Sequence, residues 1–160
     1  MRALFARLFP RPEPVVAEVT SRDAPAIAAL HAASFSRGWS EDEIERLLVD
    51  RRVLAHRVMA GREIAGFIMS RMAVDEAEIL SVAVAGRWRG RGLAGKLLAL
   101  HLRRLAGLAV RTVFLEVEDG NKPAIRLYTH AGFREVARRP GYYQQPAGAP
   151  VTALVLRRDL

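Results

Sequence analysis

Residues 87–96 combine positive charge with small side chains. They read Arg-Trp-Arg-Gly-Arg-Gly-Leu-Ala-Gly-Lys and lie between a predicted strand at 77–84 and a predicted helix that begins after Gly92. The small residues at positions 90, 92, 94 and 95 would let the backbone approach a ligand closely, with its N–H groups exposed. The first turn of the helix adds unpaired N–H donors and a partial positive charge. Because the arginines add full charge, we predict that this segment binds a diphosphate.

Two other kinds of glycine-rich loop fit this segment poorly. Gly90 and Gly95 have the spacing of a Walker loop, but Leu97 stands where the magnesium-binding Ser or Thr would be. A dinucleotide fingerprint would use Gly92 as its second glycine, and the acid near ~20 residues further on is Glu116, for which we predict another role. For the loop alone, a tight turn with solvated arginines is the alternative.

A carboxylate and a phenol follow at regular spacing. Glu116 lies near the end of a predicted strand at 111–117, and it points to the face opposite its two apolar neighbours. Asn121, Ile125 and Tyr128 share one face of the next predicted helix, with the first and last about 10 Å apart along its axis. Glu116 and Tyr128 could therefore flank a ligand that lies along this face. Taken alone, a solvent-facing strand residue and a core aromatic are the more common interpretation.

The remaining elements predict the fold class. A strand, a helix and a parallel strand in one sheet form a right-handed crossover, so we expect an α/β or α+β fold with a mixed sheet. The other predicted helices cover residues 24–35, 40–48 and 122–131, and the other predicted strands cover residues 53–58, 64–70, 133–138 and 151–156.

Length and composition limit the possibilities further. The 160 residues suffice for one domain, which we place at 15–160, preceded by a basic, proline-containing tail at 1–14. The chain has no cysteine, and its four histidines lack the spacing of a helical metal site, so we predict no metal. No apolar run approaches the ~18 residues that a membrane span requires, so we expect no membrane partner.

The charge balance indicates an anionic partner. With 25 basic and 17 acidic residues the net charge is +8, which fits nucleic acid, an acidic membrane surface or a phosphorylated cofactor. Residues 87–104 contain no acid, so we expect the positive field to be concentrated there. Aromatic residues interleaved with the arginines would favour nucleic acid, but Trp88 is the one aromatic in this segment. We therefore consider nucleic acid an improbable partner outside a ribosomal context.

Residues 79–133 resemble the acetyl-CoA-binding half of a GNAT-superfamily N-acetyltransferase. Arg89, Gly92 and Ala94 match the family pattern Arg/Gln-x-x-Gly-x-Gly/Ala. Residues 115–121 match Leu-Glu-Val-x-x-x-Asn, and residues 127–133 match Leu-Tyr-x-x-x-Gly-Phe. Within the superfamily the chain is most similar to the RimI-type ribosomal-protein-alanine N-acetyltransferases, over roughly residues 16–143.

The resemblance implies a strongly twisted, mixed β-sheet with helices on both sides, and a role for each matching residue. Glu116 would be the general base and Tyr128 the general acid. Main-chain groups of the third predicted strand would hold the acetyl and pantetheine groups at Val82, Ala83 and Val84. The diphosphate would bind the loop at Arg89, Gly90, Arg91, Gly92, Leu93, Ala94 and Gly95, and Asn121 would contact the cofactor arm. The candidate walls of the acceptor site are Trp39, Tyr142 and Tyr143.

We therefore expect a cytoplasmic acetyltransferase that acts on a protein N-terminal α-amine, possibly that of a ribosomal protein. The chain shows no covalent nucleophile, which favours direct transfer. An α-amine with a pKa near ~8 is easier to deprotonate than a lysine near ~10.4. Acetylation of a lysine or a small amine is the alternative, and a nucleic-acid-binding domain or a silent acyl-CoA-binding module would be a different class. The chain departs from its relatives at residues 144–150 and at 151–153, where they often carry an acidic pair.

Overall fold

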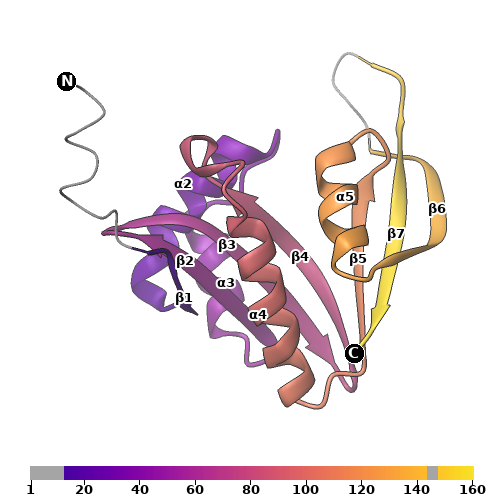
Figure 1. Ribbon diagram of the computed structural model, residues 1–160. Helices are drawn as coiled ribbons and strands as arrows, with labels where there is room; N and C mark the ends of the chain where they lie inside the picture. Colours follow the sequence, from indigo (N-terminus) through magenta and orange to yellow (C-terminus); the bar gives the residue numbers. More distant parts are fainter. Residues whose placement is uncertain (1–12, 144–147) are drawn as a thin grey trace, which may run out of the picture.

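The computed structural model describes residues 13–143 and 148–160 (Figure 1). Most of the predicted tail, residues 1–12, and most of the predicted variable loop, residues 144–147, lie outside these ranges. The predicted helices and strands are confirmed, with one additional short strand at the start. In chain order the elements are β1 (Val15–Glu18), η1 (Ser21–Asp23), α2 (Ala24–Ser34), α3 (Glu41–Val49), β2 (Val53–Ala60), β3 (Glu63–Ala73), β4 (Glu76–Val84), η2 (Gly86–Trp88), α4 (Leu93–Gly107), β5 (Thr112–Glu118), α5 (Lys122–His130), β6 (Arg134–Tyr143) and β7 (Val151–Asp159).

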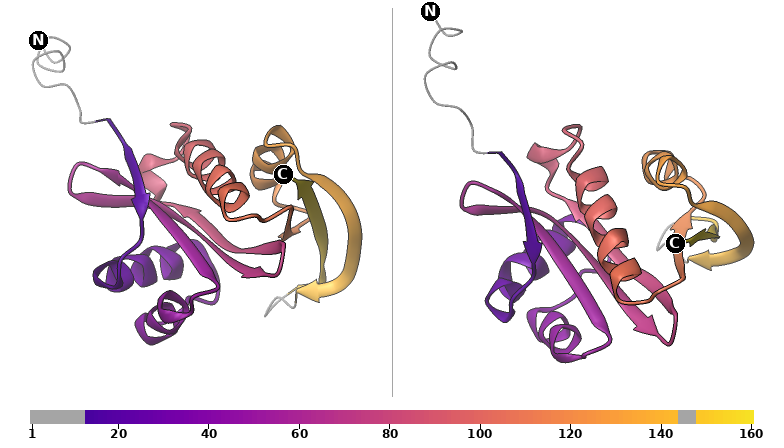
Figure 2. Two further views of the ribbon diagram at one scale, coloured as in Figure 1. Left: turned by 90° about the horizontal axis from the view of Figure 1, so that it is seen from below. Right: turned by 60° about the horizontal axis from the view of Figure 1, so that its bottom comes forward.

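The strands form one mixed sheet, as the order of the elements predicted, with helices on both faces, as the family resemblance implied. Their order is β1-β2-β3-β4-β5-β7-β6, and every neighbouring pair is antiparallel except β4 and β5, which the crossover through α4 makes parallel. Figure 2 shows α2 and α3 on one face and α4 and α5 on the other. Each face buries its own apolar cluster, the larger one beneath α4 and α5. Within the described residues, none of the helices combines the length and the apolar character that a membrane crossing requires.

The parallel strands β4 and β5 separate after a short paired stretch. Residues 76–79 pair with residues 112–115, and no pair between the two strands follows. Beyond that point β4 continues along β3 as far as Val84, while β5 continues along β7 as far as Glu118. The sheet therefore opens like a V between β4 and β5 (Figure 1). Main-chain groups on this inner edge of β4 have no strand partner on that side.

A β-bulge lies where the V begins. On β3, Ser70 pairs with Ile79 and Met69 pairs with Ser81, so Leu80 is the extra residue of β4. The extra residue shifts the alternation of β4 by one, so that even-numbered residues after the bulge point to the face that odd-numbered residues occupy before it. Before it, Ile79 packs beneath α4, whereas after it Val82 does so and Ala83 packs against the α2–α3 cluster. Ser81 therefore points to the α2–α3 face of the sheet.

A polar group is buried between the sheet and α4. The ring nitrogens Nδ1 of His56 and Nδ1 of His101 are 2.8 Å apart, and Nε2 of His101 lies 2.7 Å from Oγ of Ser70. All three side chains are buried. Burial lowers the pKa of His101 to about 3 and also lowers the pKa of His56. Both rings are therefore neutral at neutral pH and contribute to the core as hydrogen-bonding groups.

Candidate active site

A cavity of about 470 Å³ occupies the opening between β4 and β5. It brings together four residues that the sequence predicted for the site, namely Val82, Glu116, Asn121 and Tyr128. On the face of the sheet that α2 and α3 cover, the end of α2 and the loop that follows it, residues 34–36, border the cavity. Its remaining lining residues are Ser34, Phe35, Ser36, Ile79, Leu80, Ser81, Leu115, Val117, Glu118 and Ala124.

Glu116 reaches this cavity because of strand alternation. Its neighbours Leu115 and Val117 are buried beneath α4 and α5, so Glu116 points to the opposite face, where its side chain is 20% exposed. Its Oε1 atom lies 2.7 Å from Nη1 of Arg139 on β6. Arg139 could not be predicted from the sequence, because its approach to Glu116 depends on the long-range pairing of β6, β7 and β5.

Tyr128 is a core aromatic that also lines the cavity. Its side chain on α5 is 8% exposed, and its ring meets that of Phe133 edge-on with 5.8 Å between centroids. Burial raises the pKa of the phenol to about 12. The hydroxyl is therefore protonated throughout the physiological range and can donate a hydrogen bond into the cavity.

The glycine-rich loop offers an open backbone surface at the start of α4. Gly90 and Gly92 have left-handed φ values of 72° and 74°, which glycine adopts without strain. A Cβ atom added to Gly90, Gly92 or Gly95 would meet no described atom within 4 Å. The space beside these residues can therefore hold a ligand group against the N–H donors of the helix start. The side chain of Leu93 is buried in the core, so that residue can offer a ligand only its backbone N–H.

The arginines of the loop make contacts within the protein that stabilise the loop. Arg87 pairs with Glu63, which also accepts a hydrogen bond from the Trp88 indole at 3.3 Å. Arg89 Nε donates to the carbonyl oxygen of Val84 at 3.0 Å, which joins the loop to the end of β4. The guanidinium of Arg91 stacks over the Trp88 ring, 4.7 Å from its centroid. These contacts give the loop a defined shape next to the V.

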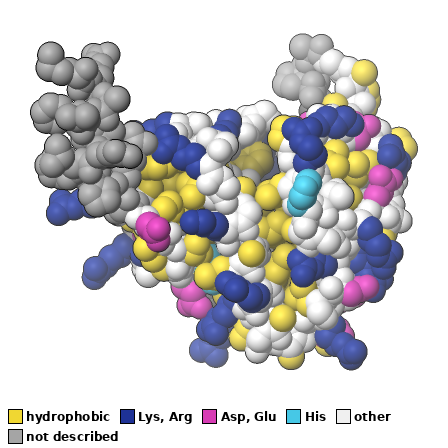
Figure 3. Space-filling model, in the orientation of Figure 1, with side chains coloured by type: hydrophobic (Ala, Val, Ile, Leu, Met, Phe, Trp, Pro, Cys, Tyr) yellow, Lys and Arg dark blue, Asp and Glu magenta, His cyan; other side chains and the backbone are white. Residues whose placement is uncertain are grey.

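The prediction of one concentrated positive field is wrong. Arg103 and Arg104 lie near the far end of α4, several turns from Gly92, and Arg104 pairs with Glu18 on β1. Figure 3 shows Lys and Arg side chains spread over this face of the molecule. The helix rise of about 1.5 Å per residue separates charges that are close in the sequence.

Asn121 has a structural role that the sequence pattern did not indicate. It precedes α5 as its N-cap, and its Oδ1 accepts a hydrogen bond from the backbone N–H of Ala124 at 3.3 Å. The residue is exposed and lines the cavity. Its side-chain nitrogen can therefore contact a ligand while the oxygen caps the helix.

Two of the three aromatic residues predicted for the acceptor site, Trp39 and Tyr142, do not line the V-shaped cavity. Trp39 stacks on His31 with 4.2 Å between ring centroids, and it lines a separate hollow of about 330 Å³ that also includes Leu80. Tyr142 is half exposed on β6, and the guanidinium of Arg139 lies 5.4 Å from its ring centroid. The side chain of Tyr143 lies outside the described part of the chain.

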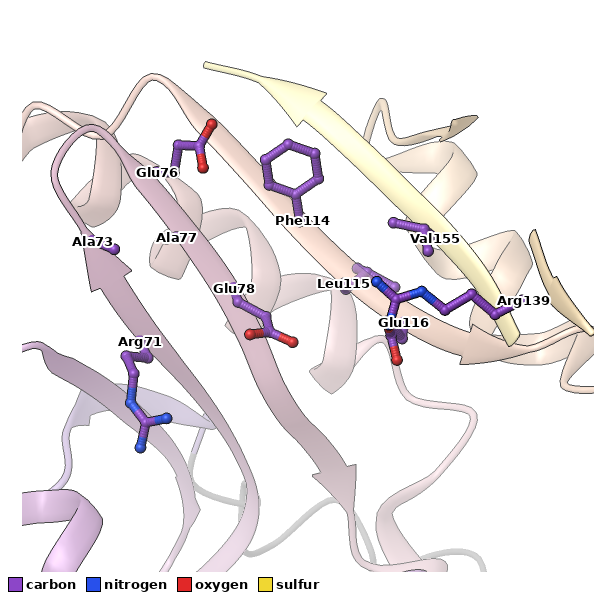
Figure 4. Close-up of a pocket in the computed structure, with 10 residues that line it drawn as sticks. All are labelled: Arg71, Ala73, Glu76, Ala77, Glu78, Phe114, Leu115, Glu116, Arg139 and Val155. Atoms are coloured by element: carbon purple, nitrogen blue, oxygen red, sulfur yellow. The ribbon is translucent and has the colours of Figure 1, made fainter. Parts of the chain in front are cut away.

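A second groove meets the cavity at Glu116 (Figure 4). Its volume is about 460 Å³, and it shares Leu115 and Glu116 with the V-shaped cavity. Figure 4 shows Glu78 and Glu116 on the neighbouring strands β4 and β5, with Arg139 extending to Glu116. Glu76 also lines this groove, and neither Glu76 nor Glu78 was predicted from the sequence to belong to the site. Glu116 is thus accessible from two cavities.

A twisted mixed sheet, a glycine-rich turn before α4 and an opening lined by a carboxylate and a phenol agree with the fold and the site that the resemblance implies. The sequence model of the acetyltransferase (GNAT) family matches residues 23–133. The chain therefore belongs to the GNAT family, and it is an acetyl-CoA-dependent N-acetyltransferase.

Relatives with assigned names show which members of the family the chain resembles. The chain is 31% identical over 105 residues to the [ribosomal protein bS18]-alanine N-acetyltransferase of Haemophilus influenzae, covering 66% of this chain and 71% of that protein. It is 28% identical over 133 residues to the enzyme of the same name from Escherichia coli K12, covering 83% and 89%. The crystal structure of the ribosomal-protein-S18-alanine N-acetyltransferase from Escherichia coli superposes with a TM-score of 0.85 at 26% identity, covering 91% of this chain and 93% of that one. The fold and the RimI-type resemblance are thereby confirmed.

Proposed function

We propose that this enzyme transfers the acetyl group of acetyl-CoA to the N-terminal α-amine of a protein, with a ribosomal protein as the acceptor. The observation that carries the proposal is the position of Glu116, where the V-shaped cavity and the second groove meet. A donor in the V and an acceptor in the groove could both reach this carboxylate. The names of the relatives support the choice of acceptor.

The residues around the V fit the donor. Acetyl-CoA would supply the acetyl group as an activated thioester. The open backbone at Gly90, Gly92 and Gly95 fits its diphosphate, because the space beside these residues is free and the helix start favours negative charge. The inner edge of β4 at residues 82–84 pairs with no described strand, and it would bind the extended pantetheine arm through main-chain hydrogen bonds other than that of the Val84 carbonyl, which accepts from Arg89. Asn121 would contact the same arm through its side-chain nitrogen.

Three groups would handle protons and charge during transfer. Glu116 would accept the proton of the ammonium, directly or through a water molecule, because an amine must be neutral to attack. Main-chain N–H groups on the inner edge of β4 would donate to the acetyl carbonyl oxygen as negative charge develops there. Tyr128 would donate to the leaving sulfur. Arg139 would hold Oε1 of Glu116 and so direct the carboxylate toward the amine.

Local carboxylates explain how a basic enzyme could accept a cationic N-terminus. The net charge of +8 repels a cationic peptide at long range. Near the reacting centre, however, four carboxylates line the two cavities and outnumber the two arginines there, Arg71 and Arg139; they are Glu76, Glu78, Glu116 and Glu118. An α-amine also loses its proton more easily than a lysine by ~2.5 pKa units, roughly 3 kcal/mol. Both effects favour N-terminal acetylation at neutral pH.

A single peptide tests the acceptor. It carries a free N-terminus and an internal lysine, and after reaction with acetyl-CoA it is digested and sequenced by mass. We expect acetyl on the α-amine, and much less of it with the Glu116→Gln variant, which keeps the size of the side chain. Acetyl on the lysine with an untouched α-amine would refute the proposed acceptor and support the alternative. Wild-type enzyme without transfer to any amine, but with bound acetyl-CoA, would indicate a silent binding module.

A further inference from the structure

Ser81 is a buried serine that lines the V-shaped cavity. The residue is 7% exposed, and it lines the cavity that also contains Glu116 and Tyr128. Its Oγ atom makes no hydrogen bond to any of the residues that the structure describes. A buried polar atom normally has a partner, and leaving it without one costs free energy. The position of Ser81 therefore needs an explanation.

A second buried serine provides the comparison. Ser70 lies on the neighbouring strand β3, is fully buried, and bonds through Oγ to Nε2 of His101 at 2.7 Å. The hydroxyl of this core serine therefore has a hydrogen-bonding partner within the protein. Ser81 lacks such a partner and borders a cavity instead, which indicates that its partner is a bound molecule.

The bulge at Leu80 determines the face of the sheet to which Ser81 points, and therefore the substrate that its hydroxyl can contact. Because of the bulge, Ser81 points to the α2–α3 face of the sheet, and strand alternation turns Glu116 to the same face. Tyr128 belongs to α5 on the other face. The hydroxyl therefore lies with the predicted base and apart from the predicted acid. This is the side from which an amine would approach the thioester.

We propose that Ser81 is an acceptor-binding residue, whose Oγ accepts a hydrogen bond from an N–H of the incoming α-amine. The inference rests on the proposed function. A neutral primary amine has two N–H groups and one lone pair. When the ammonium proton leaves through a water molecule, Glu116 can accept one of the two remaining N–H groups and Ser81 the other, and the lone pair is then held toward the carbonyl carbon of the thioester. Such orientation lowers the barrier to attack, because only one direction of the amine is reactive.

The Ser81→Ala and Ser70→Ala variants form a matched pair that tests this inference. Initial rates are measured with the N-terminal peptide varied at saturating acetyl-CoA, together with the melting temperature and the affinity for acetyl-CoA by calorimetry. We expect Ser81→Ala to lower kcat/KM for the peptide roughly tenfold, the range for one hydrogen bond, with unchanged affinity for acetyl-CoA. Its melting temperature should stay equal or rise, since an unsatisfied hydroxyl is removed. Ser70→Ala should lower the melting temperature and leave kcat/KM unchanged.

Three results would overturn the inference. The first is full kcat/KM in Ser81→Ala. The second is a loss of acetyl-CoA affinity as large as the loss of kcat/KM, which would assign the hydroxyl to the donor. The third is a fall in melting temperature like that of Ser70→Ala, with activity lost in proportion, which would assign it to the core. A wild-type enzyme that acetylates no peptide α-amine would refute the proposed function itself and this inference with it.

Discussion

The Tyr128→Phe variant tests the contribution of the phenol to catalysis. The substitution removes one hydroxyl and keeps the ring that packs edge-on against Phe133. Because Tyr128 is buried, the pKa of its hydroxyl is raised to about 12. A thiol has a pKa near ~8.5, so complete proton transfer from this phenol to a thiolate would be unfavourable by about 3.5 pKa units, or roughly 5 kcal/mol. The main contribution of Tyr128 should therefore be a hydrogen bond to the sulfur as its negative charge develops.

The size of the effect follows from that comparison. A hydrogen bond to a charged group contributes about 1.5–3 kcal/mol, which corresponds to a decrease in kcat of about 10- to 150-fold. Full general acid catalysis would extend the range to ~10⁴-fold. Since the pKa is raised, the neutral phenol persists until the pH approaches about 12. We therefore expect kcat of the wild-type enzyme to show no decline near pH 10 from ionisation of Tyr128. The pH profiles of the wild type and of Tyr128→Phe should then have the same shape in this range.

The assay is steady-state acetylation of the N-terminal peptide between pH 7 and 10.5. Unchanged melting temperature and unchanged affinity for acetyl-CoA are the controls that separate chemistry from folding and binding. Full turnover by Tyr128→Phe would leave the residue a purely structural aromatic. A loss beyond about a thousandfold, with a decline of the wild-type kcat near pH 10, would contradict the reasoning from the raised pKa and would indicate complete proton transfer.

Two further predictions concern the loop and the core. Gly92→Glu should weaken acetyl-CoA binding in calorimetry by at least tenfold, since it adds a carboxylate to the predicted diphosphate site. Gly107→Glu, at the other end of α4, should not, and equal affinity in both folded variants would refute the site. The pKa of His101 is lowered to about 3, so its neutral form stabilises the fold above pH 6.5 and that stabilisation is lost as the pH falls from 6.5 toward 3. Urea unfolding should show a decrease of up to about 1.4 kcal/mol per pH unit from this group, and a flat profile would contradict its burial as a neutral ring.

The sequence predicted those site residues whose positions follow from local periodicity. Glu116 could be assigned to one face because its neighbours in the strand are apolar, and Tyr128 because the helix repeat orders its face. β1 was missed because its four residues are mostly exposed and gain their strand conformation by pairing with β2.

Other features could not be predicted because they depend on pairing between distant segments. Arg139 approaches Glu116 only through the register of β6, β7 and β5. The orientation of Ser81 depends on the bulge at Leu80, which alternation within β4 does not indicate. The spread of the basic residues along α4, in contrast, follows from helix geometry and could have been predicted.

The short parallel joint between β4 and β5 makes the site sensitive to distant substitutions. Most groups predicted to bind the donor lie on β4 and at the start of α4, whereas Asn121, Glu116, Tyr128 and Arg139 lie on the side of β5, α5 and β6. The two sets are on opposite sides of the pairing of residues 76–79 with 112–115, which can act as a fulcrum between them. At about 3.3 Å per residue, Val84 lies about 16 Å beyond the fulcrum, and a rotation of about 5° would move it by about 1.4 Å. Misplacement of about 1 Å can cost a reaction about a hundredfold. A change of side-chain size at Ala77, which lies in this paired stretch, should therefore alter the turnover of this enzyme although no residue of the site itself is substituted.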